Sequence, residues 1–457
     1  MGLKSSIGGL FHCGLSAALL LAFPCPACSG QSETGSSSDA PGAQAPSPLH
    51  YVNQTLPSWL RFSGEFRDRG EGRTAYGFKP GIDDGYDLTR LRLNLEVAPK
   101  KWVRVFVQGQ DARALGIDQS HLNSTLKDVF DLHQAYLEFR TGDKNGLSLR
   151  VGRQELIFGA ERLVGASDWT NTARSFDAVR LGFTQWRAHV DIIAASVVAI
   201  DMVRFDKHIP GQNLYGAYAS FTDVLPKSTF QPYFLWRTLS HVKSDEGVPG
   251  SADVYTAGFR WVGKLPAGFD YATEMAKQMG HFSNDDIVAW AGYWIIGYTV
   301  PGVPLKPRLS VEYDYATGDK ARGDGRIGTF DQLYPTNHPY YGIVDMEGWR
   351  NLRDFRSGIN LAPRHNVQLT FNYNWFWLAS AQDGLYNAAG VLIVKPPAGG
   401  ALSTDVGSEA DIIFSYSPFP QVIIGCGFGH LFPGRFLKEN SPGSGTSFPY
   451  GFLTYRF

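Results

Sequence analysis

Short segments in which apolar and polar residues alternate recur along almost the whole chain after residue 58. In a β-strand, successive side chains point to opposite faces, so each segment would present one apolar and one polar face. The chain also holds 51 Gly and 26 Pro, too many for a helical protein. We therefore expect an all-β fold. The pattern is clearest in segments 88–97, 103–110, 134–140, 147–152, 178–183, 308–315 and 368–374.

The connections between these segments alternate between short and long. Short links lie near 98–101, 141–146, 184–186, 225–228, 264–267, 300–306, 362–365 and 417–420. Long polar connections lie near 69–86, 112–130, 155–174, 198–212, 239–252, 279–285, 318–349, 379–404 and 432–446. Short turns at one end and long loops at the other are typical of outer-membrane barrels. We predict a transmembrane antiparallel β-barrel of about 18 strands over residues 58–457.

The C-terminal residues continue the alternation to the last position. Leu453, Tyr455 and Phe457 would share one face of a strand, and Thr454 and Arg456 the other. A final strand that pairs with the first one closes a barrel and removes the edges that lipid would leave unsatisfied. These residues alone also fit the last strand of a soluble β-protein.

The N-terminal region predicts export. Lys4 is followed by an apolar stretch at 15–23 and then by small residues, as in a secretory signal peptide, which we place at 1–29. Cys28 follows a sequence that matches a lipidation signal poorly. Residues 30–57 are mostly rich in Ser, Gly, Pro and Ala, and we expect a flexible periplasmic lead-in. Together these features predict a protein of the bacterial outer membrane.

Composition and motifs exclude several other classes. Three of the four Cys lie in the signal region, so no internal disulfide or cysteine metal cluster is expected. With 42 Lys and Arg against 43 Asp and Glu, nucleic acid is not an expected partner. His133 and His189 have no nucleophile motif beside them, and phosphate-binding, dinucleotide and zinc motifs are absent from the sequence. We expect no catalytic residues, no cofactor and no metal site.

Three aspartates in the long loop have the oxygen ligands that calcium prefers, but a solvated loop face is the preferred interpretation. They are Asp319, Asp324 and Asp331.

Arginines recur on the polar face of the alternating segments, namely Arg90, Arg92, Arg104, Arg140, Arg150, Arg180 and Arg308. Carboxylates share that face, namely Glu96, Glu138, Glu312 and Asp314. One interpretation is a ladder of cross-strand ion pairs that makes a polar interior rigid. The other is a cationic constriction, because rings of Arg or Lys make a pore selective for anions.

The sequence resembles the alginate export family of outer-membrane barrels. The resemblance rests on motifs that occur in order from about residue 58 to the C-terminus. They are Asp87–Leu95; Val151–Gly159, Glu161–Gly165, Asp168–Asn171 and Ser175–Arg180; Thr329–Pro335, Tyr340–Gly342, Gly348–Trp349 and Asn351–Leu352; and Asp383–Asn387 with Val406–Asp411.

The resemblance implies an 18-stranded barrel that passes an anionic uronate polysaccharide through an arginine-rich lumen. The arginines inside matching motifs are Arg90, Arg92, Arg150, Arg153 and Arg180. Arg104, Arg308 and Arg356 are added on the alternation alone. We expect these eight to line the pore and bind anions.

The segment from about 317 to 349 shows little strand pattern and is dense in aromatic rings. Loops of this length in a compact fold are usually functional or disordered. A ring-rich loop can pack against itself and the barrel mouth, so we expect it to restrict the pore entrance. The alternative is a folded cap that stands clear of the pore. The residues expected to gate are Phe330, Tyr334, Tyr340 and Tyr341.

Three functions therefore stay open. The first is an export channel for an anionic polysaccharide such as alginate, and the second is a diffusion porin for small acidic solutes. The third, less favoured, is a secreted carbohydrate-binding β-protein. For a barrel, the other expected partners are outer-membrane lipid and the barrel assembly machinery. We expect a monomer, because one barrel of this size encloses a pore by itself.

Overall fold

A computed structural model describes residues 48–457 except 143–144 and 245. The expected signal peptide, Cys28 and most of the lead-in lie outside this range. The helices are α1 (Pro48–Thr55), η1 (Tyr76–Phe78), η2 (Pro266–Gly268) and α2 (Arg435–Asn440). The strands of the barrel wall are β1 (Leu60–Arg73), β2 (Asp84–Lys100), β3 (Val103–Leu115), β4 (Asp128–Arg140), β5 (Gly146–Gln154), β6 (Phe176–Gln185), β7 (Ala188–Ala199), β8 (Lys207–Thr222), β9 (Ser228–Lys243), β10 (Pro249–Lys264), β11 (Phe269–Phe282), β12 (Asp285–Thr299), β13 (Arg308–Ala316), β15 (Leu352–Arg364), β16 (Val367–Leu378), β19 (Asp405–Phe419), β20 (Val422–Pro433) and β21 (Thr446–Arg456). Three short strands lie in loops: β14 (Arg326–Ile327), β17 (Leu385–Tyr386) and β18 (Leu392–Val394).

The wall is a closed antiparallel barrel of 18 strands, as the sequence predicts. Each wall strand pairs with the next along the chain, and β21 pairs with β1 to close the ring. At this seam the amide of Gly64 donates to the carbonyl of Phe457 at 2.7 Å, and the amide of Phe457 donates back at 3.0 Å. Closure gives the backbone groups of both terminal strands partners, which hydrocarbon could not supply.

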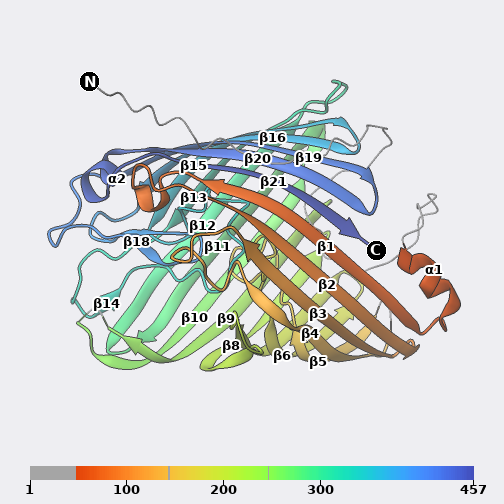
Figure 1. Ribbon diagram of the computed structural model, residues 1–457. Coiled ribbons are helices and arrows are strands. Elements are labelled where there is room, and N and C mark those ends of the chain that lie inside the picture. The colour runs from red at the N-terminus through yellow and green to blue at the C-terminus, as the bar shows by residue number, and fades with distance from the viewer. Residues whose placement is uncertain (1–47, 143–144, 245) are drawn as a thin grey trace.

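Short turns lie at one end of the barrel and long loops at the other (Figure 1). The N-terminal helix α1 and the C-terminus lie at the short-turn end, and α2, β14 and β18 lie at the loop end. The predicted short links are confirmed within a few residues. Five predicted loops are too long, because strands β1 to β4 and β7 to β12 run into 69–86, 112–130, 198–212, 239–252 and 279–285. Polar and charged residues at these strand ends interrupt the apolar alternation, so the pattern did not show that the strands continue.

The outward face of the wall is apolar. Large hydrophobic side chains at alternate positions stay exposed, among them Leu93, Val105, Leu137, Leu149, Val179, Ile192, Val288, Val311 and Ile412. A water-exposed sandwich would bury this set in its core, so lipid is the partner that the surface requires. Separately, no helix in the described part of the chain is long and apolar enough to cross a membrane.

Three long loops lie between wall strands at the loop end: 155–175, 317–351 and 379–404. The first two are joined inside the barrel by a parallel bridge between Val164 and Tyr334, and we call 155–175 the first inward loop and 317–351 the second inward loop. Their apolar side chains form one core with inward-facing wall residues such as Ala289 and Ala291. Residues 287–305, which carry no charged side chain, form most of β12 and the following turn, and β12 faces lipid on one side and this inner core on the other.

We predict that barrel closure depends on the small size of Gly64. A side chain there would meet the ring of Phe457 at 2.4 Å and the carbonyl of Arg92 at 2.8 Å. Gly64→Val and Phe457→Asp should therefore greatly reduce the heat-modifiable folded band on a gel. Gly451→Val is the matched control, because the nearest atom at that position of β21 is 3.9 Å away. Wild-type amounts of folded Gly64→Val would contradict this account of the seam.

Candidate functional site

A cavity of about 2460 Å³ opens at the short-turn end of the barrel. Its walls are the ends of the wall strands, and Ile157 and Gly159 of the first inward loop also border it. We call it the vestibule. Among the described residues its lining holds twelve Lys and Arg against four Asp and Glu. The basic residues are Lys100, Lys101, Arg104, Arg140, Arg150, Arg180, Arg187, Lys227, Arg260, Lys264, Lys306 and Arg308.

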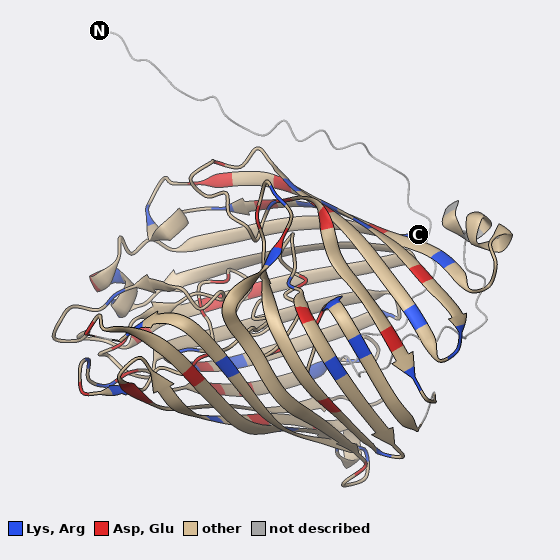
Figure 2. Ribbon diagram, turned by 90° about the horizontal axis from the view of Figure 1, so that it is seen from below, with Lys and Arg blue, Asp and Glu red and all other residues tan. Residues whose placement is uncertain are grey.

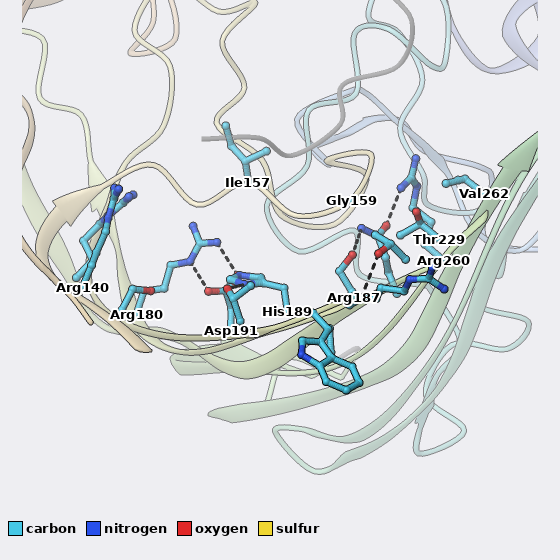
Figure 3. A pocket seen from close by; sticks show the side chains of 18 of the residues that line it. Arg140, Ile157, Gly159, Arg180, Arg187, His189, Asp191, Thr229, Arg260 and Val262 are labelled. Carbon is cyan, nitrogen blue, oxygen red and sulfur yellow. Dashed lines mark hydrogen bonds and ion pairs between the residues drawn. The ribbon is translucent and has the colours of Figure 1, made fainter. Parts of the chain in front are cut away.

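Four of the eight arginines singled out in the sequence line the vestibule, and each is paired with a carboxylate. The pairs are Arg104–Glu96 at 2.7 Å, Arg150–Glu138 at 3.3 Å, Arg180–Asp191 at 2.5 Å and Arg308–Asp270 at 2.6 Å. Three of these pairs join neighbouring strands, and the fourth joins β11 to β13 across β12; basic and acidic positions lie side by side on the wall (Figure 2). In Figure 3, Arg180 and His189 both point to Asp191. The paired arginines hold the wall in place and contribute little net charge.

The net positive charge comes from other basic side chains. Five exposed lysines stand on the turns or at the strand ends next to them, and none of them forms an ion pair with a described carboxylate. They are Lys100, Lys101, Lys227, Lys264 and Lys306. Arg260 donates to the neutral Gln231 side chain at 2.6 Å and to the Tyr293 hydroxyl at 3.3 Å, close to Gly159 (Figure 3). None of these six was expected from the sequence. Only arginines inside strand patterns or family motifs were selected there, and lysines at or beside turns show no such pattern.

Arg90 and Arg92 lie on β2 and hold the first inward loop instead of lining the vestibule. Both guanidinium groups reach the Asp168 carboxylate at 2.9 Å. Arg90 also pairs with Glu65 at 2.8 Å, and its side chain is only 1% exposed. Burial alone would raise the pKa of Asp168, but Arg90, Arg92 and Arg67 outweigh it and hold that pKa well below the ordinary range. The carboxylate is therefore charged at neutral pH.

Two further arginines on β1 complete this grip on the loop. Arg67 donates to the carbonyls of Asp168 and Thr170, each at 2.9 Å. Arg69 donates to the carbonyl of Trp169 at 2.6 Å and stacks on its ring at 4.0 Å. Neither was expected from the sequence, where residue 69 was assigned to a loop, although a spacing of two residues, as on one face of a strand, was the available signal.

Arg153 and Arg356 also lie away from the vestibule lining. Arg153 pairs with Asp177 at 2.8 Å near the loop end of β5. Arg356 on β15 pairs with Glu312 and donates to the carbonyl of Pro339 in the second inward loop at 2.9 Å. Of the eight expected arginines, the structure thus places four at the vestibule and four at inward loops or the opposite rim.

Arg162 joins the first inward loop to the opposite wall. It pairs with Glu312 and, at 2.6 Å, with Asp314, and both carboxylates lie on β13. It also donates to the hydroxyl of Tyr341 at 2.8 Å, and its guanidinium lies 3.9 Å from the ring of Tyr340. All of these groups except Tyr340 are almost completely buried. Arg162 lies in a family motif, but nothing in its sequence context showed that it would cross the barrel.

The four expected gating residues lie inside the barrel, within the second inward loop. Phe330, Tyr334 and Tyr341 belong to the inner core, and Tyr340 packs against it. Arg237 of β9 fixes the same loop through Asp331 at 2.7 Å. Asp331 is therefore an ion-pair partner, and Asp324 is exposed, so the loop aspartates considered in the sequence are not gathered at one point. The loop fills part of the lumen next to the vestibule.

The closed 18-stranded wall with an apolar belt defines an outer-membrane β-barrel channel. The sequence matches the alginate export family over residues 58–450. The chain belongs to this family.

Solved structures with a similar fold are outer-membrane proteins of low sequence identity. Pseudomonas aeruginosa OccK3 (OpdO) is 12% identical, with a TM-score of 0.59 over 90% of this chain and 99% of that chain. Pseudomonas aeruginosa OpdK, solved with vanillate, is 10% identical, with a TM-score of 0.60 over 87% of this chain and 98% of that chain. Acinetobacter baumannii OccAB4 is 11% identical, with a TM-score of 0.58 over 87% and 98%. No curated protein matches the sequence.

We predict that Arg162 keeps the inward loops in place. Arg162→Met would leave the buried Glu312 and Asp314 carboxylates without this partner, and breaking a buried ion pair costs about 3–5 kcal/mol. Single-channel conductance in planar bilayers should rise and become noisier, because the loops would leave their packed position. Arg435→Met is the control, since Arg435 is exposed and stands in α2 at the loop end, outside the vestibule lining. Unchanged conductance of correctly inserted Arg162→Met would refute this role.

The Asp168 anchor gives a prediction on pH. Because its folded pKa is depressed, its stabilisation is complete above the unfolded value of about 3.9 and is lost only as pH falls through the lower folded pKa. Asp168→Asn should increase loop mobility, measured as conductance noise. The difference from wild type should be the same at about pH 8 and about pH 5. A difference that vanishes at the lower pH would show that Asp168 titrates in that range.

Proposed function

We propose that the barrel passes an anionic saccharide chain, such as a uronate polysaccharide, with the vestibule as its periplasmic entrance. The main support for this proposal is the excess of basic over acidic side chains around the vestibule. In a narrow space with low-dielectric walls, fixed charges raise the local concentration of counter-ions, here carboxylate-bearing molecules. Membership of the alginate export family supports the same class of substrate.

The size of the vestibule favours a chain over a single small solute. Sites for small molecules usually measure about 300–1,000 Å³, and the vestibule holds about 2460 Å³. Its five unpaired lysines stand at four different turns around the opening, so a flexible polyanion could contact several of them together. A single small acid could meet only one or two.

Diffusion of small acidic solutes is the second candidate function. The inner core of the two inward loops favours it, because this packing narrows the lumen next to the vestibule. A chain would need these loops to move, whereas a small solute would need less space. The fold similarity to OpdK, a structure solved with vanillate, is consistent with this alternative but extends only to the fold.

The charge argument predicts anion selectivity that depends on the vestibule lysines. The triple variant Lys100→Gln, Lys264→Gln and Lys306→Gln should reduce the preference for chloride over potassium, measured as the reversal potential across a salt gradient. The control removes three exposed lysines from other loops, as Lys79→Gln, Lys320→Gln and Lys395→Gln. Equal shifts in both variants, or a cation-selective wild-type channel, would contradict the proposal.

Uronate oligomers of increasing length distinguish the two candidate functions. Added on the vestibule side, they should block the ion current for longer as their length increases, since each added carboxylate meets another basic side chain. If the protein is a small-solute porin, the single uronate sugar should enter proteoliposomes readily, and the duration of blockade should not depend on the length of the uronate oligomer.

A further inference from the structure

Three buried or half-buried carboxylates meet at the loop end of the barrel. Asp128 and Asp131 stand at the start of β4, and Asp206 is the last residue of the β7–β8 loop. One carboxylate oxygen from each lies within 4.8 Å of the others. Asp128 and Asp131 are each only 3% exposed. Like charges held so close and away from bulk water are unfavourable unless a proton or a cation compensates them.

The hydrogen bonds around the cluster hold it together but leave one oxygen free. The amide of Asp206 donates to the Asp131 carboxylate, which ties the loop to the strand. The amide of Asp201 donates to Asp206 at 2.7 Å. The Oδ1 atom of Asp128 is buried and has no hydrogen-bond partner among the described residues. Buried polar atoms without a hydrogen-bond partner are rare in folded proteins, and a cation bound between the three carboxylates would give this oxygen a partner.

Nearby basic groups do not neutralise the cluster. Arg153 donates to the carbonyl of Asp206 at 3.2 Å, but its charge pairs in a fork with Asp177 at 2.8 and 3.2 Å. Arg113 is paired with Asp111. No Lys or Arg among the described residues forms an ion pair with any of the three carboxylates.

We propose that Asp128, Asp131 and Asp206 form a Ca²⁺ site that fastens the β7–β8 loop to the barrel rim. Ca²⁺ takes oxygen ligands at about 2.3–2.6 Å, so two ligands of one ion can be as far apart as about 5 Å, and oxygens within 4.8 Å of one another can all reach one ion. Mg²⁺ keeps several waters and usually binds through one or two carboxylates, so a set of three carboxylates favours Ca²⁺. A purely carboxylate set also disfavours zinc and copper, which prefer imidazole or thiolate. Water would complete the coordination shell.

This site differs from the sequence expectation of no metal. The ligands come from two segments more than seventy residues apart in the chain, and they match no calcium-loop motif. The proposal does not depend on which solute the channel carries, because it concerns the rim opposite the vestibule.

The test is calorimetric titration of CaCl₂ into the folded, chelator-treated barrel in detergent. We expect one Ca²⁺ per chain, and at least about tenfold weaker binding in Asp128→Asn, because affinity follows the number of charged ligands. Asp324→Asn, which removes an exposed loop carboxylate, should bind as wild type does. The melting temperature of wild type and of the control should rise with CaCl₂, and that of Asp128→Asn should not.

Absence of Ca²⁺ binding by wild type would overturn the proposal, and so would an Asp128→Asn variant that binds with wild-type stoichiometry and affinity. If Asp128→Asn does not fold, Asp206→Asn is judged by the same two outcomes. MgCl₂ binding as tight as CaCl₂ binding would overturn the assignment to calcium.

Discussion

The pairing of β21 with β1 is the constraint on which the rest of the structure depends. Without it two strands would expose unpaired backbone groups to hydrocarbon, where no water can satisfy them. The pairing also fixes the circumference and therefore the space inside. It places both ends of the wall at the short-turn end, where the amides and carbonyls of Gly64 and Phe457 exchange hydrogen bonds. The inward loops and the vestibule are arranged within the space that this closure defines.

Inside the barrel, charged side chains of the wall hold the inward loops, which have no neighbouring strand to pair with. Arg67, Arg69, Arg90 and Arg92 grip residues 168–170, and Arg237 grips Asp331. Arg162 works in the opposite direction, because it stands on a loop and reaches the wall. A loop inside a barrel must satisfy its own backbone and side-chain polar groups, and arginine can satisfy several of them at once.

The charged interior therefore divides into two parts with different roles. Near the inward loops, arginines are buried and matched with carboxylates or backbone carbonyls. At the vestibule the paired arginines stiffen the wall, and the unpaired lysines and Arg260 supply the net charge. The two interpretations left open by the sequence, an ion-pair ladder and a cationic lining, thus apply to different residues of one interior.

The sequence by itself determined the barrel, because period-two alternation and the order of short and long links are local properties that every strand repeats. It also located the turns, the C-terminal strand and the ring-rich loop. It did not determine which loops fold inward, since the contacts of Arg162 with Asp314 join residues 152 positions apart. Tertiary structure likewise decided which basic residues keep free charge, because a carboxylate can be taken by a different basic side chain. Lys264 stands opposite Asp270 on β11, but Asp270 pairs with Arg308 of β13, whereas Arg180 pairs with Asp191 of β7.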